Sequence, residues 1–140
     1  MSDTYLGPAP DTIEEATAKL IEIINEQAPP SMWDEEEHTF IAHLHHNLGQ
    51  DIRNYWGLWS RDTELHNRIA GQFYLSHADD MSGLLLKSVY RTYHDLPLEL
   101  EEEAANSLDF WAATLRGEPF TVQYGDMKIQ VNQCQRTDQA

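Results

Sequence analysis

The sequence predicts a mainly α-helical protein, a compact bundle of about five helices with a small C-terminal β-hairpin. Apolar residues recur at intervals of three and four between residues 12 and 117, which is the spacing of one face of a helix. After Pro119 the spacing changes to two, which is typical of strands. The length of 140 residues fits a single domain, 1–140, with one core.

The first helix is expected over residues 12–27, within a helical core that spans 11–117 and follows a flexible arm at 1–10. Asp11 and Glu14 have the spacing of a helix-capping pair. Pro29 and Pro30 would end the helix, because the residue before a proline is pushed out of the helical region. The apolar face comprises Ile13, Ala16, Leu20 and Ile24, with Ile21 beside them.

The second helix, capped by Ser31 or Asp34, is expected to continue without a break through to Trp56. The acidic run 34–37 would start it, because the positive end of the helix dipole favours carboxylates. Gly57 is placed to end the helix in the left-handed region, after which Leu58 and Trp59 would fold back onto it. The apolar face comprises Phe40, Ile41, Leu44, Leu48, Ile52 and Tyr55.

A short third helix is expected over residues 62–72, with Gly71 marking its end. Asp79 or Asp80 would cap a long fourth helix, because aspartate is favoured at helix starts. The buried face of that fourth helix would comprise Met81, Leu84, Leu85, Val89 and Tyr93.

Pro97 suits the first turn of a fifth helix, which Gly117 would end. Residues 119–131 alternate apolar with polar side chains around Gly125-Asp126, which predicts a hairpin with a two-residue turn. Residues 132–140 are expected to form a disordered tail. The inner face of the fifth helix would comprise Leu100, Ala104, Leu108, Trp111, Ala112 and Leu115.

The charge is strongly negative, with 24 Asp and Glu against 9 Lys and Arg and a formal net charge of −15. Direct binding to nucleic acid or to an anionic membrane is not expected, because both need a basic patch. A basic protein is the natural electrostatic partner, although an acidic surface also simply keeps a protein in solution. Without a signal sequence or membrane span, and with Cys134 as its single cysteine, the chain is expected in the cytoplasm.

Short strings at residues 52–54 (Ile-Arg-Asn), 57–59 (Gly-Leu-Trp) and 79–82 (Asp-Asp-Met-Ser) follow a helix that begins near Pro10. In this order they resemble a family of uncharacterised domains associated with bacteria and phages, over about residues 10–94. The family typically has proline where this chain has Ala78. The resemblance implies an all-helical fold and brings no activity and no catalytic residue with it.

The same strings predict a structural role for their polar residues. A buried ion pair between Arg53 and Asp79 or Asp80 would explain why the strings occur together. Asn54 would satisfy backbone groups of the following loop. The structural residues expected in this segment are Arg53, Asn54, Gly57, Trp59, Asp79 and Asp80.

Motifs for catalysis or metal binding are weak. His43 and His46 have helical i, i+3 spacing and are the candidate metal ligands, which His38, His66, His77 and Asp79 could supplement. They form no recognised zinc motif, and no serine or cysteine stands in a nucleophile motif. We therefore expect no catalytic residue, no bound metal and no cofactor.

The leading hypothesis is a non-catalytic acidic interaction module that inhibits or regulates a basic, nucleic-acid-handling protein. Phage anti-defence proteins, including inhibitors of CRISPR effectors, and nuclease immunity proteins follow this logic. The alternatives are a metal-dependent enzyme with a His/Asp cluster, and an assembly subunit that forms a homodimer through the hairpin. The expected partner-binding residues are Asp34, Glu35, Glu36, Glu37, Glu99, Glu101, Glu102 and Glu103.

Overall fold

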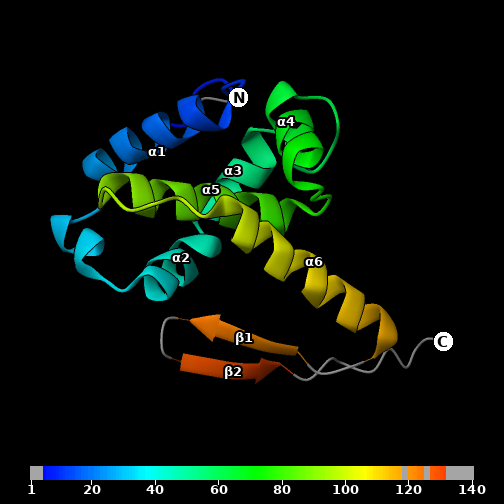
Figure 1. Cartoon of the computed structure of the whole chain (residues 1–140). Helices are drawn as coiled ribbons and strands as arrows, with labels where there is room; N and C mark the ends of the chain where they lie inside the picture. The colour runs from blue at the N-terminus through cyan, green and yellow to red at the C-terminus, as the bar shows by residue number, and fades with distance from the viewer. Residues whose placement is uncertain (1–4, 118–119, 125–126, 132–140) are drawn as a thin grey trace.

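The computed structural model describes residues 5–117, 120–124 and 127–131, which are mainly helical, as predicted (Figure 1). No described helix combines the length and apolar character that crossing a bilayer requires. The helices and strands in the described ranges are α1 (Ile13–Gln27), the 3-10 helix η1 (Pro30–Asp34), α2 (Glu37–His45), α3 (Leu48–Tyr55), α4 (Glu64–Phe73), α5 (Ala78–Tyr93), α6 (Leu100–Arg116), β1 (Phe120–Tyr124) and β2 (Met127–Val131).

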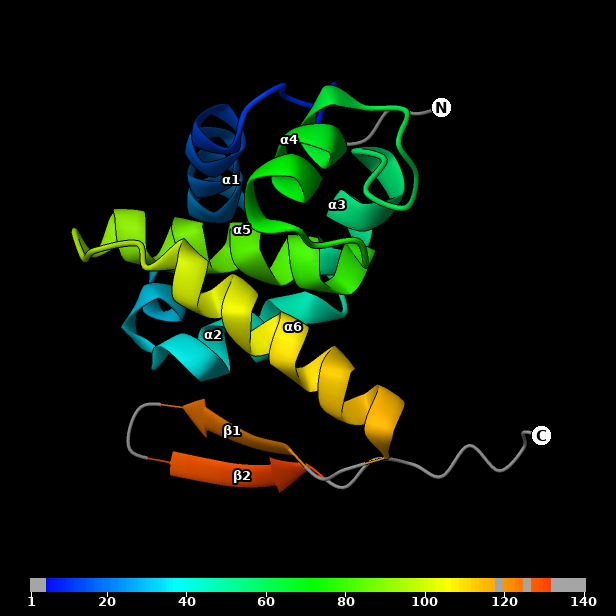
Figure 2. The same cartoon turned by 45° about the vertical axis from the view of Figure 1, so that its right-hand side comes forward.

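Helix α5 is the centre of the bundle. It contacts α1, α2, α3 and α6, and Figures 1 and 2 show α1 and α4 on one side of it and α2 on the other. A helix covered on several sides has buried residues around most of its circumference rather than along one stripe. The buried residues of α5 are Ala78, Met81, Ser82, Leu84, Leu85, Leu86, Lys87, Ser88 and Val89.

The prediction of one continuous helix from Ser31 or Asp34 through to Trp56 is wrong. The chain breaks between α2 and α3, where the Asn47 side chain accepts a hydrogen bond of 2.6 Å from the Leu48 N–H. Asparagine suits such a position because its side chain can replace a missing backbone acceptor. The apolar spacing continues through the break, because both short helices bury residues against α5.

The acidic run 34–37 does not form one helix start. Asp34 ends η1, and Glu37 is the member of the run that lies in the first turn of α2. The 3-10 helix positions Trp33 in the core, where its ring stacks on Tyr93 with 3.7 Å between ring centroids and 4° between planes. Because residues 30–34 form η1, α2 begins only at Glu37, later in the chain than predicted.

The predicted helix caps also shift. Thr12, not Asp11, caps α1: its hydroxyl accepts a hydrogen bond of 3.1 Å from the Glu15 N–H. His77 caps α5, with Nδ1 accepting a bond of 3.0 Å from the Asp79 N–H, because the Asp79 carboxylate faces Arg53 instead.

Helix α4 continues past Gly71 and ends at Phe73, where Tyr74 takes a left-handed conformation with a φ of 61°. Helix α6 begins at Leu100 rather than in the turn after Pro97, because the chain reverses direction through a left-handed Glu99 with a φ of 52°.

The described part of the N-terminal arm, residues 5–10, packs against the core. Leu6 is fully buried, the Gly7 carbonyl accepts a hydrogen bond of 3.2 Å from the Trp56 indole, and Tyr5 donates one to Asp51. Burial, followed by that bond, raises the pKa of the Tyr5 hydroxyl. Residues 1–4 lie outside the described ranges.

Strands β1 and β2 pair in antiparallel register, with Phe120 opposite Val131 and Tyr124 opposite Met127. The predicted turn at Gly125-Asp126 and the predicted tail at 132–140 lie outside the described residues.

Helix α6 extends away from α5 toward β1 (Figure 1), which explains an error in its predicted inner face. Four predicted inner residues of α6 are exposed, namely Leu108, Trp111, Ala112 and Leu115.

Gly57, the second residue past α3, adopts a φ of 72°, as expected for a glycine that ends a helix, and a Cβ there would lie 2.7 Å from Thr63 Cγ2. We predict that Gly57→Ala destabilises the protein by about 2 kcal/mol or more, from left-handed strain together with that clash. Gly117→Ala is the matched control, because Gly117 also has a φ of 72° but open space around it, so its cost should be about 1 kcal/mol.

Thr63→Ser in the Gly57→Ala background should recover the clash component, because it removes Cγ2 and keeps the hydroxyl that caps α4. Urea unfolding measures all four free energies. Equal costs for Gly57→Ala and Gly117→Ala, with no recovery in the double variant, would show that the contact with Thr63 carries no energy.

Candidate interaction surface

Arg53 of α3 lies in the corner where α2, α3 and α5 meet and is only 5% exposed. Its Nη1 donates to Ser82 Oγ at 2.8 Å, and its Nη2 donates to the His45 carbonyl at 3.1 Å. Gly49 permits this placement, because a Cβ there would lie 3.1 Å from the Leu44 carbonyl oxygen and 3.2 Å from Arg53 Nη1. One guanidinium therefore ties together three helices.

The structure pairs Arg53 with Asp79 and not with Asp80. Nε of Arg53 lies 3.2 Å from Asp79 Oδ1, which is an ion-pair distance, but the Nε–H forms no hydrogen bond with a described residue. The side chain of Asp79 is 45% exposed, so the ion pair joins a buried cation to a carboxylate at the surface. Asp80 instead accepts a hydrogen bond of 2.7 Å from the Trp111 indole.

Two predicted structural residues at the end of α3 behave differently. The backbone reverses at Gly57, where the Leu58 N–H bonds to the Arg53 carbonyl at 3.0 Å, as in a Schellman helix end. Asn54 does not satisfy loop backbone groups as predicted. Its side chain accepts a hydrogen bond of 2.9 Å from the Trp59 indole, because Trp59 folds back over the helix end.

Trp59, His77 and Trp111 form what we call the aromatic surface. The ring centroid of His77 lies 5.8 Å from that of Trp59 and 5.5 Å from that of Trp111. Trp59 and Trp111 are 58% and 38% exposed, whereas Trp33 and Trp56 are buried. The indole N–H groups of Trp59 and Trp111 donate hydrogen bonds to Asn54 and Asp80, respectively, and these bonds fix the two rings at the surface. Fixed, exposed tryptophans are typical of binding hot spots.

Arg91 joins the two predicted acidic runs, which are far apart in sequence. It donates to both carboxylate oxygens of Glu37, at 2.8 and 3.0 Å, and its Nη1 donates to Glu99 at 3.0 Å. The hydrogen bond to Glu37 raises the pKa of Arg91 above its ordinary value. Nζ of Lys87 lies 3.5 Å from Oε1 of Glu103. We call the eight predicted partner-binding residues the acidic cluster.

Members of the acidic cluster differ in how far they are neutralised. Glu37, Glu99 and Glu103 have the cationic partners just described. Oε1 of Glu35 lies 2.9 Å from Nδ1 of His43, and Oε1 of Glu36 lies 3.5 Å from Nε2 of His38. Three members are exposed and have no ion pair with another described residue, namely Asp34, Glu101 and Glu102.

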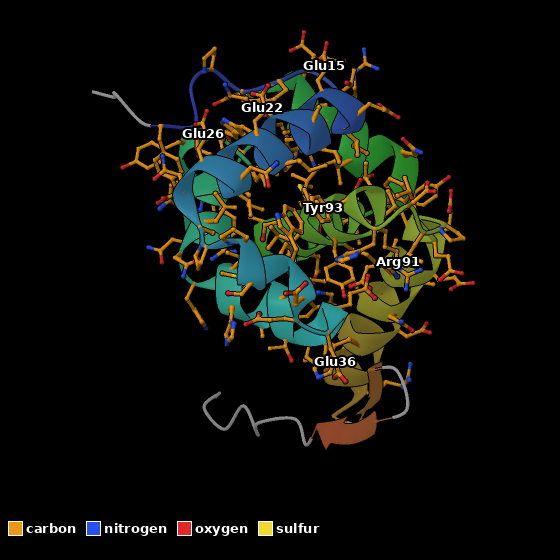
Figure 3. All side chains as sticks on the ribbon, turned by 90° about the vertical axis from the view of Figure 1, so that its left-hand side faces the viewer. Glu15, Glu22, Glu26, Glu36, Arg91 and Tyr93 are labelled. Atoms are coloured by element: carbon orange, nitrogen blue, oxygen red, sulfur yellow. The ribbon has the colours of Figure 1, made fainter. Side chains whose placement is uncertain are left out.

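The outer side of α1 carries acidic residues that the sequence reasoning did not assign to a surface. Figure 3 shows Glu15, Glu22 and Glu26 along this helix, and all three are exposed. Their spacing of seven and four residues places them on one face of a helix. That periodicity was available in the sequence and could have identified them.

The structure does not gather the candidate metal ligands. Within the described ranges no group of three or more His, Cys, Asp or Glu side chains is arranged to hold a metal ion. His43 pairs with Glu35, His46 lies at the end of α2 against His45, and His66 bonds to the Leu58 carbonyl at 2.9 Å.

We predict that Arg53→Ala destabilises the protein by about 3 kcal/mol, because Ser82 Oγ and the His45 carbonyl lose a buried donor. Asp79→Asn should cost about 1 kcal/mol, since its half-exposed side chain interacts with water and screening weakens the pair. Urea unfolding measures both. Unchanged stability of Arg53→Ala would contradict its structural role.

Burial, followed by the charge of Arg53, lowers the pKa of His45. Folding therefore favours neutral His45, and its contribution to stability is lost as the pH falls from about 6.5 through the lower folded-state value. We predict that His45→Gln unfolds less readily on acidification than the wild type. Unfolding free energies from pH 8 to pH 5 test this; a constant difference between the two proteins would contradict it.

A model of the family described as a domain of unknown function, DUF6794, matches residues 9–93. The match ends with the last residue of α5, so α6 and both strands lie outside it. The predicted resemblance to an uncharacterised family over about residues 10–94 is confirmed. No curated protein and no solved structure matches the chain. Since the match covers more than half of the sequence, the protein belongs to the DUF6794 family of domains of unknown function.

Proposed function

We propose that this protein is a non-catalytic acidic interaction module that binds and inhibits a basic, nucleic-acid-handling protein. The observation that carries the proposal is the meeting of two acidic runs at Arg91. The two runs contribute eight carboxylates, and only Arg91 and Lys87 of the described lysines and arginines form ion pairs with them. The acidic cluster therefore retains a large negative charge. An interaction of this kind steers a basic partner during encounter and orients it.

The free carboxylates are suited to contact a partner, because binding does not require breaking an internal ion pair. Asp34 stands before α2, while Glu101 and Glu102 stand in the first turn of α6. Carboxylates presented in this way can occupy positions on a nucleic-acid-binding protein that phosphates would otherwise fill, and inhibition follows from that competition. Phage anti-defence proteins and nuclease immunity proteins are the functional classes that this logic fits.

The aromatic surface supports the same proposal as a source of short-range affinity. His77 of this surface is the N-cap residue of α5, whereas Arg91 lies near the last turn, a separation of about 21 Å along the helix axis. Charged rims contribute mainly to association rate and specificity, while buried aromatic side chains contribute most of the binding energy. A partner that spans both regions would use the two contributions together.

We predict that Asp34→Lys combined with Glu102→Lys abolishes capture of the partner from extracts of the native host. The matched control is Glu22→Lys combined with Glu26→Lys, which makes the same change in net charge on the outer side of α1 and should retain capture. Thermal unfolding verifies that both variants fold, because reversing Glu102 costs up to about 1 kcal/mol at a helix start.

The captured protein should be basic, and its affinity should fall steeply between low and physiological salt. Salt-insensitive capture, or equal loss in the two variants, would count against an interface at the acidic cluster. Replacing Trp59 or Trp111 by alanine should weaken binding of the same partner at constant net charge.

A further inference from the structure

A groove with a volume of about 510 Å³ opens between α1, the end of α4, the second half of α5 and the start of α6. Its apolar walls include Ile13, Ala18, Ile21, Phe73, Leu98 and Leu100. The volume lies within the range of binding sites that accept small molecules or clusters of side chains. The groove is a feature separate from both the acidic cluster and the aromatic surface, although it shares Glu101 with the former.

The polar atoms in the inner part of the groove are already satisfied. Thr17 Oγ1 donates to the Ile13 carbonyl at 2.8 Å and lies 2.8 Å from Ser88 Oγ, and both side chains are buried. These hydroxyls do not require hydrogen bonds from a ligand, since each proton has a partner within the fold. The groove therefore favours an occupant that presents apolar groups.

The charge of the groove selects among apolar occupants. Two exposed carboxylates line it, Glu14 from α1 and Glu101 from α6, and no lysine or arginine is among its described lining residues. The first turns of α1 and α6 also carry Glu15 and Glu102, both exposed. An apolar segment flanked by cations matches this pattern, whereas an acidic segment would be repelled.

We propose that the groove receives the apolar face of a basic amphipathic helix of the partner protein, whose flanking lysines or arginines pair with Glu14 and Glu101. This inference rests on the proposed function and names the element of the partner that is bound. A helix places apolar side chains at i, i+3, i+4 and i+7 in one groove and basic side chains at its borders. Glu101 belongs to both regions, so a helix bound in the groove would lie beside the acidic cluster.

The test uses the full chain and two synthetic peptides of equal composition. In one, leucines and lysines are arranged as an amphipathic helix; in the other, the same residues are scrambled. The amphipathic peptide should bind about tenfold or more tightly than the scrambled one, because burying one large apolar side chain contributes at least that factor. Amide chemical shifts should change at Ala18, Ile21, Phe73 and Leu98.

Ala18→Gln should remove the preference for the amphipathic peptide, because it places a polar amide in the groove without changing net charge. Ala42→Gln is the matched control, since Ala42 is an exposed alanine of α2 outside the groove, and it should keep the preference. Glu14→Gln with Glu101→Gln should weaken binding more than Glu22→Gln with Glu26→Gln does, at equal net charge.

The outcomes separate this inference from the proposed function. Equal, salt-sensitive binding of both peptides, or shift changes outside the groove, would overturn the helix-in-groove inference and leave the acidic cluster as the interface. Absence of binding by either peptide would overturn the inference as well. If capture of the host partner also survives reversal at Asp34 and Glu102, the proposed function fails independently.

Discussion

The buried guanidinium of Arg53 is the interaction on which the arrangement of α2, α3 and α5 depends. A cation removed from water is tolerated only when surrounding groups replace its hydration, and Ser82, the His45 carbonyl and Asp79 do so from two neighbouring helices. These groups must therefore keep fixed positions relative to α3. The same requirement explains Gly49, whose lack of a side chain leaves space beside the guanidinium.

Fixing α5 in this way positions the rest of the surface. At its first turn, Asp80 holds the Trp111 indole and His77 contacts both exposed tryptophans. Near its last turn, Arg91 and Lys87 gather carboxylates from α2 and from the start of α6. Next to Lys87 in the sequence, Ser88 meets Thr17 of α1 at the groove. One central helix thus sets the spacing of three surface regions.

Local chemistry explains which parts of the fold could be predicted. The apolar face of α1 and the left-handed glycines 57 and 117 follow from residue spacing and backbone preferences, and both are present as expected. The break at Asn47 was missed because apolar spacing continues across it. The caps of α1 and α5 were misassigned because several polar residues stand near each helix start, and only the surrounding contacts select Thr12 and His77.

The sequence by itself determined the helical class and the negative charge, because these depend on composition and on short-range periodicity. Only the tertiary structure decided which carboxylates remain free, since neutralisation of Glu37, Glu99 and Glu103 requires α2, α5 and α6 to meet. It also decided which tryptophans are exposed. Burial depends on contacts between residues distant in the chain, and no local pattern records them.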